Sequence, residues 1–175
     1  MCDVTFLVGK DKTPVYGLKS VIAARSSVLC DLILNRQRQY YTGKSSSSRA
    51  SKMWKFLRFD KKKKPAKAKI GRMSTSTKLE IPVSHFDENV FRKLVFFLHL
   101  GHVTVTQDTL IGLLCAASEF KVADLSRACW EFLDRSLSLG HLTGIVQPAE
   151  QYRKHPAYQS ITEKVQSSER SQKST

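Results

Sequence analysis

The stretch KSVIAARSSVLCDLIL, residues 19–34, decides the fold. Its first part, Lys19 to Ala24, has the length and composition of one or two helical turns. Ser26 or Ser27 can then cap a second helix. In that helix the apolar residues follow the i, i+1, i+4, i+5 spacing of a buried face, as Val28, Leu29, Leu32 and Ile33. We expect two consecutive helices, the second ending near Asn35.

Two short extended stretches precede these helices. Residues 4–8 are mostly β-branched or aromatic, and residues 13–16 form a second extended stretch after the turn GKDK at residues 9–12. This pattern predicts a β-hairpin. The fold should therefore begin with a hairpin that leads directly into the helices.

The second half of the chain predicts one more strand and three stronger helices. KLEIPV at residues 78–83 has the pattern of a short strand, with a proline suited to a sheet edge. Asp87 can cap the helix that follows, and Gly101 can end it in a left-handed conformation. Thr106 and Asp124 can cap the next two helices. The expected fold class is α+β, a small three-stranded sheet flanked by about five helices.

The net charge of +14 is confined to one segment. The fifteen Lys or Arg residues and the single acidic residue, Asp60, of residues 35–78 account for all of it. Elsewhere, 14 basic and 14 acidic residues cancel. The segment also contains a serine run, a lysine run ended by Pro65, and no apolar periodicity. We expect a disordered basic insertion at residues 36–77 within a neutral globular body.

Four blocks of the sequence resemble the BTB/POZ family. CDVT at residues 2–5 resembles the start of many BTB domains, and KSVIAARS at residues 19–26 is similar to the family's H-[KR]-x-V-L-A-A-R-S. FRKLVFFLHLGHV at residues 91–103 resembles F-x-x-[LF]-[LV]-x-[FY]-[IL]-Y-T-G-x-V, and residues 113–133 resemble the last helix pair. The chain departs from these patterns at Leu18, where the family has His, and at His99 and Leu100, where it has Tyr and Thr.

The resemblance implies a division of the chain. Residues 1–138 would form the BTB/POZ domain, interrupted at residues 36–77. Residues 139–166 form a helical extension that resembles the start of a BACK region, and residues 167–175 are expected to be a disordered tail. Because this extension is too short for a whole BACK region, we expect a fragment or short form of a larger adaptor.

Asp3 and Lys19 line up with a charged pair that lies near the dimer groove of BTB domains. Removing one partner of a buried pair is costly, which favours an architectural role over a catalytic one. The resemblance begins at the first strand, so we expect no dimerisation through the preceding helix that long-form members exchange.

No catalytic residue, cofactor or metal site is expected, and the chain is predicted not to be an enzyme. His99 and His102 share a helical spacing, but Gly101 predicts the end of that helix, and no nearby Cys or acid completes a tetrahedral set. Cys115 and Cys129 fall on inward helical positions, where free cysteine behaves as a small hydrophobe. The sequence contains no nucleophile elbow, HExxH motif or glycine-rich phosphate loop.

The sequence also predicts a cytoplasmic and/or nuclear location. The four cysteines are widely spaced, no CxxC motif occurs, and the N-terminus has no secretory signal. No apolar run approaches the roughly 20 residues that span a bilayer.

The basic segment has three interpretations. It could be a nuclear-import signal, a site for nucleic acid or an anionic membrane, or a solvated tether with phosphorylation sites such as Ser51 and Ser74. The candidate cationic residues are Lys61, Lys62, Lys63, Lys64, Lys67, Lys69 and Arg72, and the candidate docking aromatics are Trp54, Phe56 and Phe59.

The resemblance implies a protein-interaction module that self-associates, acts as an adaptor, or both. In many members the partner is a cullin-RING ubiquitin ligase, contacted partly just after the helix in which LCDLIL lies here, where this chain carries its basic segment. The alternative is a nuclear or anionic-surface binding module driven by that segment.

Overall fold

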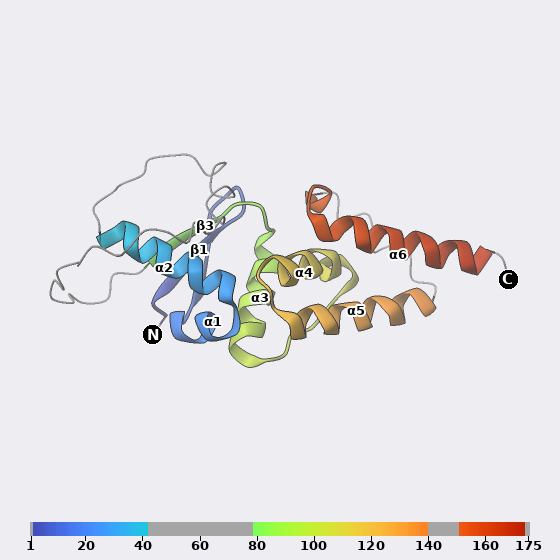
Figure 1. The fold of residues 1–175 in the computed structure, drawn as a ribbon, viewed down its shortest axis with the longest axis horizontal. Coiled ribbons are helices and arrows are strands. Elements are labelled where there is room, and N and C mark those ends of the chain that lie inside the picture. Colours follow the sequence, from blue (N-terminus) through green and yellow to red (C-terminus); the bar gives the residue numbers. More distant parts are fainter. Residues whose placement is uncertain (1, 42–78, 140–150, 174–175) are drawn as a thin grey trace, which may run out of the picture.

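The computed structural model describes residues 2–41, 79–139 and 151–173. These residues form a small sheet and six helices (Figure 1). The elements in chain order are β1 (Val4–Val8), β2 (Thr13–Gly17), α1 (Lys19–Arg25), α2 (Ser27–Tyr41), β3 (Leu79–Val83), α3 (Glu88–Leu100), α4 (Gln107–Glu119), α5 (Ala123–Ser138) and α6 (Pro156–Lys173). The predicted α+β class is confirmed.

The sheet has the strand order β2-β1-β3. β1 and β2 form the predicted antiparallel hairpin, with Phe6 opposite Val15. β3 adds to the other side of β1 in parallel, with Phe6 opposite Ile81. Pro82 therefore lies on an edge strand, where its missing N–H breaks no ladder bond inside the sheet.

The molecule is elongated. Figure 1 shows the sheet with α2 at one end, α3 near the centre, and α5 and α6 running towards the end that carries the C-terminus. The core that joins these parts contains an aromatic series from the sheet through α3 to the end of α4. Phe6 and Phe91 have ring centroids 5.1 Å apart, and Phe91 meets Phe120 edge-on at 5.7 Å.

Most of the predicted helix boundaries are confirmed. Asp87 caps α3, because its Oδ2 accepts hydrogen bonds from the backbone N–H groups of Asn89 and Val90, and Gly101 ends the helix at φ 79°. Thr106 caps α4 through a reciprocal capping box with Thr109.

The predicted cap of α5 is wrong by two residues. The structure places Val122 at this position, so Asp124 lies in the first turn of α5. The turn after α4 closes through the backbone, since Val122 N–H donates to Ala117 O at 2.9 Å and Lys121 adopts φ 53°. The helix therefore starts early, and the carboxylate of Asp124 complements the helix dipole instead of capping it.

The predicted end of α2 near Asn35 is also wrong. The helix continues to Tyr41, so the first six residues of the expected insertion 36–77 are helical. Arg and Gln are good helix formers even without an apolar stripe. Arg36 further fixes this extension beside β3 by donating from Nε to Glu80 O at 2.9 Å.

The C-terminal part differs from the expectation as well. α6 begins at Pro156, a residue suited to a first helical position, and runs to Lys173. Most of the expected tail 167–175 is therefore helical. The buried face of α6 contains Tyr158, Ile161 and Val165, which belong to the hydrophobic core. Residues 140–150 of the expected helical extension 139–166 lie outside the described residues.

Candidate interaction surface

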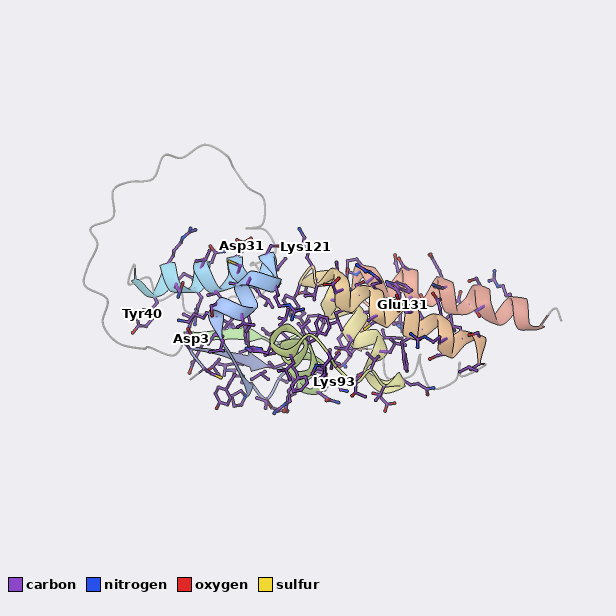
Figure 2. All side chains as sticks on the ribbon, turned by 90° about the horizontal axis from the view of Figure 1, so that it is seen from below. Asp3, Asp31, Tyr40, Lys93, Lys121 and Glu131 are labelled. Atoms are coloured by element: carbon purple, nitrogen blue, oxygen red, sulfur yellow. The ribbon has the colours of Figure 1, made fainter. Side chains whose placement is uncertain are left out.

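The structure brings Asp3 and Lys19 together where β1 begins and α1 starts. Asp3 Oδ1 accepts the backbone N–H of Lys19 at 2.8 Å, and Oδ2 lies 3.8 Å from Lys19 Nζ. Figure 2 shows Asp3 at the outside of this end of the sheet. The pair is not the buried one expected, because the side chains are 47% and 23% exposed. Its ion pair is therefore worth little to folding, while the backbone bond orders the start of α1.

His99 of α3 bonds to the backbone between β2 and α1, next to the Asp3–Lys19 pair. Its Nε2 accepts the backbone N–H of Leu18 at 3.1 Å, and its Nδ1 lies 2.7 Å from Val95 O, to which it donates. Both ring nitrogens thus have backbone partners. His102 instead places its ring edge-on to Phe96, with centroids 5.9 Å apart. The helical spacing of the two histidines reflects packing.

Two residues at the end of the KSVIAARS block, Arg25 and Ser26, bond to the C-terminal ends of α3 and α4. Arg25 Nη1 donates to Phe97 O at 3.2 Å and to Leu98 O at 3.1 Å, which satisfies carbonyls in the last turn of α3. Ser26 Oγ donates to Phe120 O at 2.6 Å and accepts Leu29 N–H at 3.2 Å. The sequence indicated Ser26 only as a local cap, because Phe120 is 94 residues away.

Exposed apolar side chains occur on β2 and α3, the elements next to the junction at which Asp3 and Lys19 meet. Leu100 follows His99 and is 54% exposed, and Phe96 lies one turn earlier on the same helix face. Tyr16 on β2 is also exposed. We call Asp3, Tyr16, Lys19, Phe96 and Leu100 the N-terminal face. A charged pair next to exposed apolar residues is typical of surfaces that bind other proteins.

The buried cysteines behave as the sequence predicted. Burial raises the pKa of both Cys115 and Cys129 to about 12, so both thiols stay protonated at neutral pH. Within the described residues, no group of three or more His, Cys, Asp or Glu side chains could hold a metal ion. No helix among those residues is long and apolar enough to cross a membrane.

The candidates of the basic segment, Lys61 to Lys64, Lys67, Lys69, Arg72, Trp54, Phe56 and Phe59, lie outside the described residues. Sequence reasoning missed another group, in which His85 and His155 both face Glu119. These residues are 34 or more positions apart, so no local spacing could have indicated it.

Part of the chain matches a known domain family. Residues 64–137 match the BTB/POZ domain. A Drosophila melanogaster protein described as "Serine-enriched protein" is 27% identical over 94% of this chain. Mouse Kelch-like protein 28 is 30% identical over 53% of the chain. The chain spans only 14% and 16% of the lengths of these relatives.

Two solved structures are similar to this one. The BTB domain of zebrafish PATZ1 has a TM-score of 0.44 and 17% identity, with 77% of each chain covered. The BTB domain of human Gigaxonin has a TM-score of 0.43 and 18% identity, with 75% of this chain and 76% of that one covered. The family match covers α3, α4 and nearly all of α5, where two of the four sequence blocks lie. Residues 64–137 of the chain are therefore similar to the BTB/POZ domain, a family of protein-interaction modules.

Proposed function

We propose that this chain is a protein-interaction adaptor that self-associates through the N-terminal face and recruits a cullin-RING ubiquitin ligase. The observation that carries the proposal is the partly exposed Asp3–Lys19 pair, which the Leu18–His99 bond joins to the end of α3, where Leu100 is exposed. A second copy of the same surface would offer complementary charges and an apolar centre. Each Asp3 carboxylate could then contact the Lys19 ammonium of the other copy.

Replacing Lys19 by Met should weaken self-association by up to about 30-fold, because it removes two symmetry-related ion pairs and a partly exposed pair contributes about 1 kcal/mol or less. Light scattering of the full chain over a concentration series measures the dimer dissociation constant. Lys10→Met is the matched control, since Lys10 is an exposed residue beyond the opposite end of the hairpin. Equal dimer stability in both variants, or a monomeric parent chain, would exclude this face as the contact.

The ligase part of the proposal is tested with a purified cullin N-terminal region. We expect the chain to bind it, and a variant lacking residues 42–77 to bind more tightly. The removed segment follows α2, the helix after which the family resemblance implies part of the ligase contact. Starting the deletion at residue 42 keeps the whole of α2 and leaves β3 intact.

A second variant separates charge from length in that experiment. Replacing Lys61, Lys62, Lys63 and Lys64 by Gln keeps the segment's length and removes four positive charges. If it binds the cullin as tightly as the deletion variant, charge is what weakens binding. If neither the full chain nor the deletion variant binds, the ligase function is wrong, and self-association is judged by light scattering alone.

A further inference from the structure

The segment before α6 is attached to the BTB/POZ body at one buried place. The backbone N–H of Asp87, at the cap of α3, donates to the Tyr152 hydroxyl at 3.2 Å. The Tyr152 ring also packs on Gly112 of α4, where a Cβ atom would lie 3.0 Å from it. Phe86 contacts the rings of both Tyr152 and His155. The docking of α6 therefore starts from the turn at residues 152–155.

His155 has distinct roles for its two ring nitrogens in this turn. Nδ1 accepts the backbone N–H of Ala157 at 3.2 Å, so the imidazole acts as the N-cap of α6. Nε2 points to Glu119 Oε2 at 3.5 Å. Because Nδ1 is an acceptor, it carries no proton in this arrangement, and the proton of the neutral ring lies on Nε2.

A second proton on His155 conflicts with this geometry. It would have to sit on Nδ1, where the Ala157 N–H already points, so two donors would face each other. It would also place a positive charge at the positive end of the dipole of α6, an 18-residue helix. Both effects disfavour the imidazolium while α6 is docked.

We propose that His155 is a proton-sensitive cap that holds the segment 152–173 on the BTB/POZ body at neutral pH and releases it on acidification. Release would expose the part of α4 around Gly112 and the Tyr152 side chain. Taken together, the cap, the tyrosine and the facing carboxylate form a latch between two parts of the chain.

The surroundings of His155 both lower and raise its pKa. Burial is the main cause that lowers the pKa of His155 below its usual 6.5, and His85 lowers it further, while Glu119 raises it. His85 itself lies 2.7 Å from Glu119 Oε1 and shares that carboxylate. Asp87 faces the segment through Tyr152, and on its own element Arg153 and Lys154 are exposed.

The sign of the pH effect follows from this direction. With a depressed pKa in the docked state, the released state binds more protons below pH 6.5. Docking is therefore fully favourable above about pH 6.5 and weakens as the pH falls towards the docked-state pKa. Because one proton is involved, the docking equilibrium constant should fall by no more than tenfold per pH unit.

Trp130 reports on docking. This residue of α5 has Lys164 Nζ of α6 5.0 Å above its ring, and Lys164 also pairs with Asp134 of α5 at 2.5 Å. In a Trp54→Phe background Trp130 is the only tryptophan. We expect its emission to move to longer wavelength between pH 7.5 and pH 5.0, since release of α6 exposes the indole to water.

His155→Asn tests the role of the titrating cap. Asparagine is a good N-cap that does not titrate, so the emission shift should be lost while docking at pH 7.5 remains. His102→Asn is the control, because His102 packs on Phe96 of α3 and should leave the shift unchanged. The same shift in His155→Asn as in the parent would overturn the proposal.

A measurement on the unaltered chain decides the case even where the variant does not fold. Nuclear magnetic resonance of the His155 ring should report the neutral Nε2–H form at pH 7 and a titration below pH 6.5. A ring that titrates above pH 6.5, or one that carries its neutral proton on Nδ1, would contradict the latch.

Discussion

Replacing Phe91 by alanine is expected to lower the free energy of unfolding by about 3–5 kcal/mol. The Phe91 ring is fully buried and lies between Phe6 of the sheet and Phe120 at the end of α4. Its loss leaves a cavity at the point where three parts of the fold meet, and the rigid sheet cannot collapse into it. Urea unfolding followed by circular dichroism measures the change.

Phe96→Ala is the matched control, since it makes the same chemical change on the same helix. Phe96 is 47% exposed, so its loss should cost about 1 kcal/mol or less. The contrast between the two variants reports burial, because the helix propensity change is identical. Similar losses in both would show that the aromatic series is not the centre of the core.

Local signals in the sequence predicted both ends of α3 correctly. Asp87 and Gly101 were identified as helix ends because a cap is decided by one residue and its nearest turn. α2 was predicted too short because polar helix formers after Asn35 left no apolar stripe, and the bond from Arg36 to Glu80 links residues 44 positions apart. Long-range bonds of this kind leave no trace in spacing.

At the N-terminal face, too, the sequence indicated some features and not the long-range contacts. The resemblance indicated Asp3 and Lys19 as a pair, and their side chains do meet. The resemblance did not indicate that this pair is partly exposed. It also did not indicate the hydrogen bond between Leu18 and His99, two positions at which the sequence departs from the family pattern. The two positions meet through the backbone N–H of Leu18, a contact between residues 81 positions apart that local spacing does not indicate.

Replacing Ser26 by alanine is expected to lower the free energy of unfolding by about 1–3 kcal/mol, although only one hydroxyl is lost. That hydroxyl caps α2 through Leu29 N–H and donates to Phe120 O. Since Ser26 is buried, the Phe120 carbonyl would be left without this donor and away from water. Urea unfolding gives the size of the loss.

Ser27→Ala is the control for this change, because Ser27 is the adjacent, exposed residue and begins the same helix. It should alter stability by no more than about 0.5 kcal/mol. A difference between the two variants assigns the loss to the bond that joins the start of α2 to the end of α4. If the two variants lost the same free energy of unfolding, the KSVIAARS block would contribute to stability only by forming helices. The bond from Ser26 to Phe120 would then add nothing to the contact between the start of α2 and the end of α4.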